Sequence, residues 1–214
     1  MSRYLRPRAP GAPIFFTVRL RDTTSDLLRR EVAALREAVM VERLRRPFHI
    51  DAFVVLPDHL HCLWTLPPDD SDCAVRWQAI KAEFSRRVAA RVPRSPGKRR
   101  RGQLGIWKRG YWQHPIRDAR DYRAHLHYCW ADPVQHGLCA RAADWEFSSF
   151  HREVRQGWVE ADWAGQVPEG MYGEQEGPGS LMAQAGSGPA DTRALPASAR
   201  PPSCGQAGPP GGGP

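Results

Sequence analysis

Runs of apolar residues with strand and helix periods alternate along the first quarter of the chain. The run 14–20 is rich in aromatic and β-branched residues, which is typical of a strand. Apolar side chains then recur at three- and four-residue spacing from Leu28 to Val39, which predicts an amphipathic helix that continues to Arg45. Pro47 ends this helix, and the apolar run that follows it, 48–55, predicts a second strand.

A third predicted strand, 59–66, carries two histidines inside an apolar run. Pro57 and Asp58 form a turn between the second and third strands, which indicates an antiparallel hairpin. Because side chains alternate between the two faces of a strand, His59 and His61 share one face, roughly 7 Å apart. Two hydrogen-bonded histidines on an ordinary strand would give the same pattern, so the pair indicates a metal site only if further ligands reach it.

A second helix follows, with N-caps offered by Asp70, Ser71 and Asp72. Its apolar residues form one stripe that predicts a core face. Its basic residues fall outside this stripe and are expected on the surface: Arg76, Lys81, Arg86, Arg87 and Arg91. A solvated basic face and a phosphate-binding face fit this pattern equally well.

A basic loop and an aromatic segment come next. The loop 93–102 is interrupted by Pro and Gly and contains Arg99 and Arg100 within a run of cations that would repel one another unless an anion lies alongside. The segment 106–116 interleaves aromatic rings with cations, a mixture that stacks bases and holds phosphates in single-stranded nucleic acid. Its candidate contacts are Lys108, Arg109, Trp112 and His114. An edge strand whose tryptophan side chains pack inward would show the same pattern.

The third predicted helix covers 119–131, with Asp118 as its N-cap and Pro133 as its stop. Tyr128 and Asp132 are four residues apart, so they project from neighbouring positions on one helix face. They are the candidate partners of the histidine pair.

Two imidazoles and one carboxylate, from His59, His61 and Asp132, form a three-ligand site with open positions. Such a site lets a divalent metal act as a Lewis acid on a phosphoryl oxygen. The phenol of Tyr128, with an ordinary pKa near 10, is a poor nucleophile while protonated, but a polarised phosphodiester lowers the demand on it, so that a covalent phosphotyrosine can form. Tyr122 lies six residues before Tyr128 and is rotated well off that helix face.

Composition separates a folded part from a tail. The 214 residues include a segment, 166–214, in which Gly and Pro make up 20 of 49 residues, and such a composition cannot bury enough apolar surface to offset chain entropy. We therefore expect one domain, 1–165, and a disordered tail, 166–214. The net charge is +8, and the segment 74–127 alone has 15 Lys and Arg against three acidic residues, which favours a polyanionic partner.

Cysteine usage and hydropathy bear on the compartment. Five widely spaced cysteines without a Cys-x-x-Cys pair argue against a disulfide framework and against a cysteine-rich zinc module. They are typical of reduced thiols. Neither a signal peptide nor a run of 18 apolar residues is found in the sequence, so we expect no membrane span and a cytoplasmic, nucleoid-associated protein.

Three segments resemble the REP-associated tyrosine transposases, which are single-tyrosine HUH endonucleases related to small insertion-sequence transposases. The segments are LPDHLH at 56–61, RGYWQHPIR at 109–117 and YCWADPVQHGL at 128–138. The resemblance spans roughly residues 4–163 in the order that the family shows.

The resemblance implies an α+β, ferredoxin-like fold of order β-α-β-β-α-β-α, in which an antiparallel sheet carries the His-x-His strand. This agrees with the order predicted from the apolar pattern. The family's histidine pair falls on His59 and His61, and its nucleophile falls on Tyr128. Asp132 departs from the pattern, because the family usually has asparagine there; aspartate remains an oxygen ligand but adds charge. Pro133 also biases Asp132 away from helical geometry, which makes its reach to the metal less secure.

The resemblance also implies a metal and a substrate. The family's metal is usually Mg²⁺ or Mn²⁺, whereas two imidazoles alone would favour zinc or another imidazole-preferring ion. The expected reaction is cleavage and strand transfer of single-stranded DNA at hairpin repeats through a covalent 5′-phosphotyrosine, by a monomer or a homodimer. Two alternatives remain open, a hairpin-binding protein with little catalysis and a metal-dependent phosphodiesterase that uses water in place of Tyr128.

Overall fold

The computed structural model describes residues 11–92, 105–165 and 172. The chain divides into two units, 1–176 and 177–214, and all the described residues belong to the first unit, which is the one described below. Arg99 and Arg100 lie outside the described residues. So does the predicted tail, 166–214, with the exception of Tyr172, which is buried.

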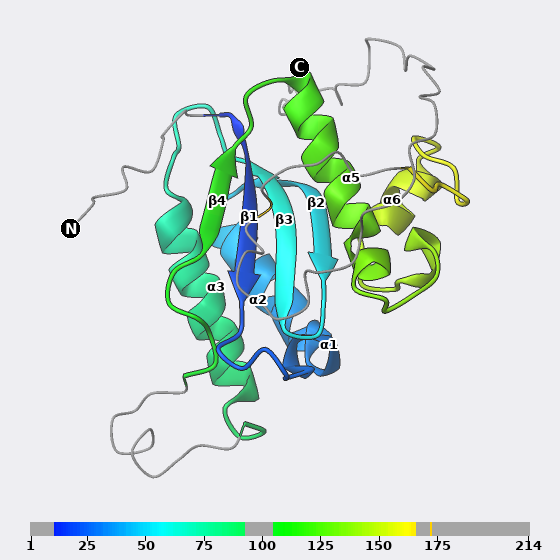
Figure 1. The fold of residues 1–214 in the computed structure, drawn as a ribbon. Coiled ribbons are helices and arrows are strands. Elements are labelled where there is room, and N and C mark those ends of the chain that lie inside the picture. Colours follow the sequence, from blue (N-terminus) through cyan, green and yellow to red (C-terminus); the bar gives the residue numbers. More distant parts are fainter. Residues whose placement is uncertain (1–10, 93–104, 166–171, 173–214) are drawn as a thin grey trace, which may run out of the picture. The chain divides into compact units, whose positions relative to one another are not determined.

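Four strands form one antiparallel sheet in the spatial order β2-β3-β1-β4 (Figure 1). Their bounds are Pro13–Arg19 for β1, His49–Val55 for β2, His59–Thr65 for β3 and Trp112–Pro115 for β4. The helices are α1, Leu27–Arg30; α2, Val32–Arg45; α3, Cys73–Val88; α5, Ala119–Gln135; and α6, Phe150–Arg155, with a short 3-10 helix, η1, at Ala142–Asp144. The order along the chain is that of a ferredoxin-like domain, so the predicted fold class is confirmed. The single helix expected over 28–45 is interrupted at Glu31, which separates α1 from α2.

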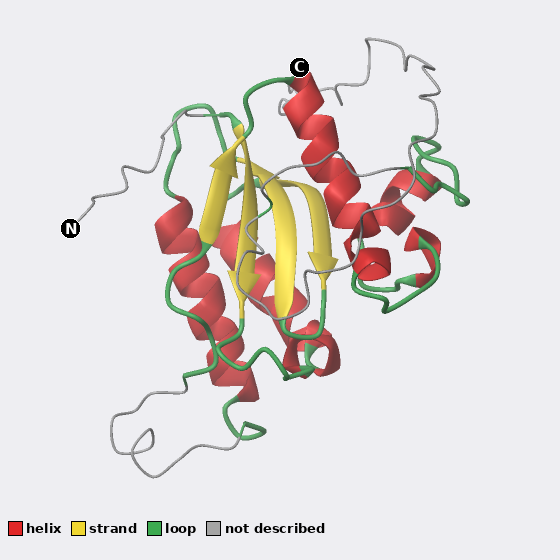
Figure 2. Cartoon of the chain, in the orientation of Figure 1, coloured by secondary structure: helices red, strands yellow, loops and turns green. Residues whose placement is uncertain are grey.

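The two faces of the sheet are covered by different helices (Figure 2). On one face, Phe16 of β1 and Trp64 of β3 pack against Trp77 of α3, and the rings of Trp64 and Trp77 stack with centroids 4.4 Å apart. Burial of each such ring contributes about 1.5–3 kcal/mol. On the other face, Phe15 and Leu63 belong to the cluster that contains the buried residues of α5. Because side chains alternate along β3, His59 and His61 lie on the α5 face.

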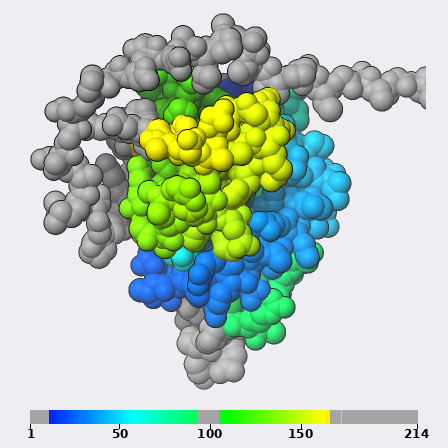
Figure 3. Space-filling view, turned by 90° about the vertical axis from the view of Figure 1, so that its right-hand side faces the viewer, coloured from blue at the N-terminus to red at the C-terminus, as the bar shows by residue number. Residues whose placement is uncertain are grey.

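The segment that follows α5 runs along the outer edge of β2. Backbone hydrogen bonds join Val55 to Phe147 and Ser149 to Phe53, so this segment satisfies donors and acceptors that the edge strand would otherwise expose. In Figure 3, which shows the molecule from this side, the segment with η1 and α6 covers a broad area of the surface.

The expected exposure of Arg76 is wrong. This side chain at the start of α3 is 1% exposed, and its guanidinium binds the carboxylate of Asp70 and donates to the carbonyl oxygens of Arg46 and Pro47. A buried guanidinium needs this full set of acceptors. Arg76 therefore ties the start of α3 to the end of α2 and is a structural residue.

The predicted stop of the third helix at Pro133 is also wrong, because α5 continues to Gln135 with the proline inside it. His136 caps the helix, and Gly137, which follows it, has a left-handed φ of 66°. The amide of Gly137 donates to the carbonyl of Val134 and the amide of Leu138 to that of Pro133, which is the Schellman arrangement. Asp132 consequently keeps helical geometry despite the proline that follows it.

Candidate metal and nucleophile site

The two histidines of β3 are each held through Nδ1. His59 Nδ1 is 2.7 Å from a carboxylate oxygen of Asp58, and His61 Nδ1 is 2.9 Å from the hydroxyl oxygen of Thr17. That hydroxyl donates its own proton to the carbonyl of Tyr172, so it accepts the Nδ1 proton of His61. When one ring nitrogen of a neutral imidazole donates, the other has the lone pair. Both Nε2 atoms are therefore in the form that binds a metal.

Asp132 of α5 reaches the same place. It is fully buried, with one carboxylate oxygen, Oδ2, 3.4 Å from Nε2 of His61 and 3.9 Å from Nε2 of His59. Neither of its oxygens has a hydrogen-bond partner among the described residues. A buried carboxylate without a donor is costly, and a divalent cation between it and the two imidazoles would satisfy it. The three predicted ligands therefore fit a metal ion.

His136, which the sequence pattern did not single out, lies at the same site. Its Nε2 is 3.4 Å from Oδ1 of Asp132, the oxygen that does not face His61. Among the described residues, His59, Asp132 and His136 form a group whose ligand atoms all lie within 4.8 Å of one another. The available signal was the four-residue spacing from Asp132, but the expected helix stop at Pro133 concealed it.

Tyr128 is next to the histidines. Its ring centroid lies 5.1 Å from that of His61, and its side chain comes from the same face of α5 as Asp132. The ring of Tyr172 stacks on Tyr128 with centroids 3.8 Å apart and an angle of 6° between the planes. Tyr128 is consequently only 4% exposed. The ring of Tyr172 thus covers one face of the Tyr128 ring.

Tyr122 has a different environment, as its position on the helix indicated. Its hydroxyl donates to Asp51 of β2 at 3.1 Å, and burial together with the Asp51 carboxylate raises the pKa of Tyr122 above its ordinary value. A phenol that holds its proton this firmly is a poor nucleophile.

A second group of possible ligands, His114, Asp121 and His125, also lies on the α5 face. Burial alone would raise the pKa of Asp121, but hydrogen bonds from Arg117 and His114 outweigh it, and the pKa is lowered. The Asp121 carboxylate accepts from His114 Nε2 at 2.8 Å and from Arg117 at 3.0 Å, so it already has cationic and neutral donors. In contrast to Asp132, it leaves no oxygen without a partner, and we interpret this group as the structural junction of β4 and α5.

The predicted DNA contacts fall on two sides of the sheet. Lys81 and Arg86 belong to α3, which covers the face opposite the histidines. Lys81 donates to the carbonyl of Gly110 at 2.5 Å, and burial lowers its pKa to about 8. Arg86 is exposed and pairs with Glu83.

The other candidates lie near β4. Trp112 contacts Phe15 on the histidine face, and its ring is parallel to that of His114 with centroids 6.0 Å apart. Lys108 and Arg109 are exposed in the segment that leads into β4.

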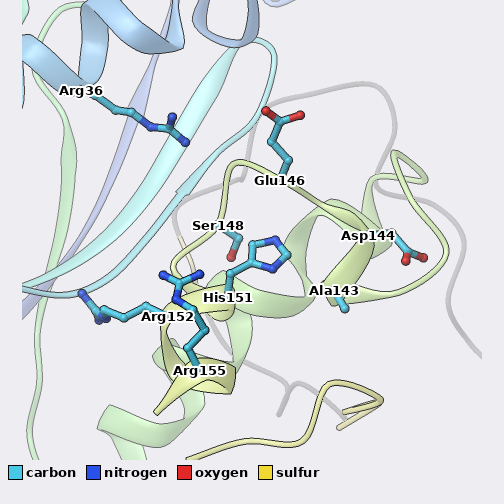
Figure 4. Close-up of a pocket in the computed structure, with 8 residues that line it drawn as sticks. All are labelled: Arg36, Ala143, Asp144, Glu146, Ser148, His151, Arg152 and Arg155. Atoms are coloured by element: carbon cyan, nitrogen blue, oxygen red, sulfur yellow. The ribbon is translucent and has the colours of Figure 1, made fainter. Parts of the chain in front are cut away.

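One pocket on the first unit is separate from the histidine site (Figure 4). It is lined by Arg36 of α2, by residues of the segment 143–148 and by α6. Two arginines of α6 are offset there by Asp144 and Glu146, and Arg152 already donates to the carbonyls of Ile50 and Asp51. This mixed charge indicates no particular ligand. Within the described residues, none of the helices has the length and apolar character needed to cross a membrane.

Comparison of the chain with known proteins shows which family it is related to. No family model matches the chain. The chain is 41% identical over 175 residues to the REP-associated tyrosine transposase of Escherichia coli (strain K12), covering 82% of this chain and 98% of that protein. It is 36% identical over 166 residues to a Haemophilus influenzae protein assigned to the same family, covering 77% of this chain and 94% of that relative. A solved structure of a REP-associated tyrosine transposase bound to a REP hairpin superposes with a TM-score of 0.72 over 82% of this chain and 99% of that one, at 41% identity.

These relationships agree with the fold and with the tyrosine beside a histidine pair, and they define an enzyme of the tyrosine transposase class. The chain belongs to the family of REP-associated tyrosine transposases.

Proposed function

We propose that this chain cleaves and transfers single-stranded DNA at hairpin repeats through a covalent 5′-phosphotyrosine on Tyr128. The observation that carries the proposal is the position of Tyr128 beside His61, at a site where a fully buried carboxylate, Asp132, has no hydrogen-bond donor among the described residues. A hairpin substrate is supported by the related transposase that has been solved with a REP hairpin bound.

His59, His61 and Asp132 would hold a divalent ion, Mg²⁺ or Mn²⁺, which when bound polarises the phosphodiester. The bond changes at phosphorus begin with Tyr128. The phenolic oxygen of Tyr128 forms a bond to phosphorus while the bond from phosphorus to the 3′ oxygen of the preceding nucleotide breaks. The phenolic proton is lost, and the departing oxygen takes up a proton to become a 3′ hydroxyl. Attack by another 3′ hydroxyl reverses these steps and transfers the strand.

The DNA path that we propose follows β4 to the site. Trp112 and His114 offer parallel rings on the histidine face, where an unpaired base can stack, and exposed Lys108 and Arg109 offer cations for phosphates. Arg99 and Arg100 of the basic loop remain proposed phosphate contacts. Lys81 and Arg86 also remain proposed contacts. The amino group of Lys81 lies beside Arg109, because it donates to the carbonyl of Gly110, whereas Arg86 belongs to the helix that covers the opposite face.

A denaturing gel with a labelled REP-type hairpin and its flanking single strand tests the reaction. With Mn²⁺ or Mg²⁺, we expect a protein–DNA adduct that survives denaturation, and we expect Tyr128→Phe to abolish it while retaining hairpin binding. Tyr122→Phe is the matched control and should form the adduct. Cleavage without an adduct would favour the hydrolytic alternative, and a mobility shift without cleavage would favour a hairpin-binding protein.

A further inference from the structure

We propose that His136 is a fourth ligand of the metal ion, so that the centre consists of three imidazoles and one carboxylate. This inference rests on the metal site of the proposed function and extends it by a residue at the end of α5. It follows from the side-chain geometry around Asp132.

The distances favour coordination by a shared ion. The Nε2 atom of His136 is 3.4 Å from Oδ1 of Asp132, and the ring centroids of His136 and His59 are 5.1 Å apart. Two atoms that each bind one ion at about 2.1 Å lie about 3.0–4.2 Å from each other. A charge-assisted hydrogen bond between imidazolium and carboxylate would be shorter, about 2.7–2.9 Å. The observed separation matches the first arrangement.

The carboxylate itself requires a second contact. The oxygen Oδ2 of Asp132 faces His59 and His61, and Oδ1 faces His136, yet both oxygens are buried without a hydrogen bond among the described residues. An ion coordinated by His136 as well would satisfy Oδ1 in addition to Oδ2. His59, Asp132 and His136 also form a group whose ligand atoms lie within 4.8 Å of one another. His61 is not in this group and is placed at the centre by the 3.4 Å from its Nε2 to Oδ2 of Asp132.

The local fold places His136 at the rim of the site. The Schellman cap at Gly137 makes His136 the last residue before the helix ends, one turn after Asp132. Its side chain is 38% exposed, whereas those of His59, His61 and Asp132 are 3%, 0% and 0% exposed. His136 therefore approaches the ion from the solvent side, and its exposure means that its replacement should leave the core intact.

The test is a titration with Mn²⁺ of the full chain, freed of metal by a chelator that is then removed, with free Mn²⁺ followed by electron paramagnetic resonance. We expect the unsubstituted chain to bind Mn²⁺ and His136→Ala to bind it at least tenfold more weakly. His49→Ala is the control, because His49 is also an exposed histidine near a carboxylate, 3.4 Å from Asp51, but lies beside Thr65 at the other end of β3. Its affinity should not change. His136→Asn, which keeps a polar side chain of similar length, should resemble His136→Ala.

The outcomes separate the two proposals. If the unsubstituted chain binds Mn²⁺ and His59→Ala abolishes binding, but His136→Ala binds like the unsubstituted chain, the role of His136 is wrong and the metal site of the proposed function stands. If the unsubstituted chain binds no Mn²⁺, both the role of His136 and the metal site of the proposed function are overturned. Pulsed measurements of nitrogen coupling to bound Mn²⁺ give a second readout, in which His136→Ala should lose one coupled imidazole relative to His49→Ala. An unchanged coupling pattern would also contradict the inference.

Discussion

Two buried carboxylates near the site differ chiefly in whether their oxygens accept hydrogen bonds. Asp132 and Asp121 are both buried carboxylates of α5, yet Asp121 has donors from Arg117 and His114 and Asp132 has none among the described residues. A buried carboxylate without a hydrogen-bond donor is costly, and this cost is the reason that we propose a metal ion between Asp132 and the neighbouring imidazoles. Satisfaction of hydrogen bonds thus distinguishes two clusters that ligand counting alone would treat as equal.

Tyr122→Phe should lower stability without affecting catalysis. The substitution removes the hydroxyl that donates to Asp51 and leaves that buried carboxylate with one donor fewer, although Thr65 still donates to its other oxygen. We expect a loss of about 1–2 kcal/mol in the free energy of unfolding, measured by urea denaturation. Loss of the covalent adduct in a folded Tyr122→Phe chain would contradict the assignment of Tyr128.

His125 should make stability depend on pH in a defined direction. Burial lowers the pKa of His125 below the ordinary 6.5, and it outweighs the hydrogen bond from Nδ1 to the carbonyl of Asp121, which raises the pKa. The Nε2 atom is buried without a partner among the described residues. As pH falls through 6.5 the unfolded chain takes up a proton before the folded chain does, so stability is lost in the window just below 6.5. His125→Gln should have a shallower slope of unfolding free energy against pH there, and an equal slope in both proteins would refute this.

At the scale of elements, the sequence predicted the strands well and the ends of helices less well. The alternation along 59–66 correctly placed both histidines on one face, and the spacing of Tyr128 and Asp132 correctly placed them together, because these are local consequences of strand and helix periods. The end of α5 was missed, because the Schellman hydrogen bonds at Gly137 outweigh the local bias of Pro133. His136 was missed for the same reason.

The faces of the sheet are another property that the sequence did not reveal. An apolar stripe shows which side of α3 is buried, but not which face of the sheet it covers. The sequence therefore grouped Arg86 with Trp112 and His114, although Arg86 belongs to α3 on one face of the sheet and Trp112 contacts Phe15 on the other.

Gly137→Ala should destabilise the end of α5. Gly137 has a φ of 66°, a left-handed conformation that costs a residue with a Cβ about 1–2 kcal/mol. A Cβ added at this position would meet no atom within 4 Å, so only backbone strain, and no steric clash, should lower stability. We expect an equal loss in the free energy of unfolding by urea denaturation. Gly157→Ala, after the end of α6, has a φ of 72° and the same open surroundings, so it should lose a similar amount of stability. A Gly137→Ala chain as stable as the unsubstituted one would show that the helix end can rearrange.

At the scale of the first unit, the site depends on a residue far away in sequence. Tyr172 lies 155 residues from Thr17, yet its carbonyl accepts from the Thr17 hydroxyl and its ring covers Tyr128. The sequence could not predict this contact, because Tyr172 is a single aromatic residue in a segment whose Gly and Pro content predicts no packed structure. Periodicity reports local structure, whereas this contact joins the two ends of the folded part.

Tyr172→Ala should accelerate formation of the Tyr128 adduct. The ring of Tyr172 covers one face of the Tyr128 ring, and we expect it to leave when DNA approaches. A stacked aromatic pair contributes about 0.5–1.5 kcal/mol, so removing this contact should raise the rate of adduct formation about 2- to 10-fold. The measurement is a single-turnover time course of adduct formation with excess protein, on a chain whose folding is verified by its thermal melt. Trp158→Ala, which removes a ring that is 51% exposed, is the control and should leave the rate unchanged. An adduct that forms at the same rate or more slowly with Tyr172→Ala would indicate that Tyr172 supports Tyr128 in its reactive position and does not obstruct it.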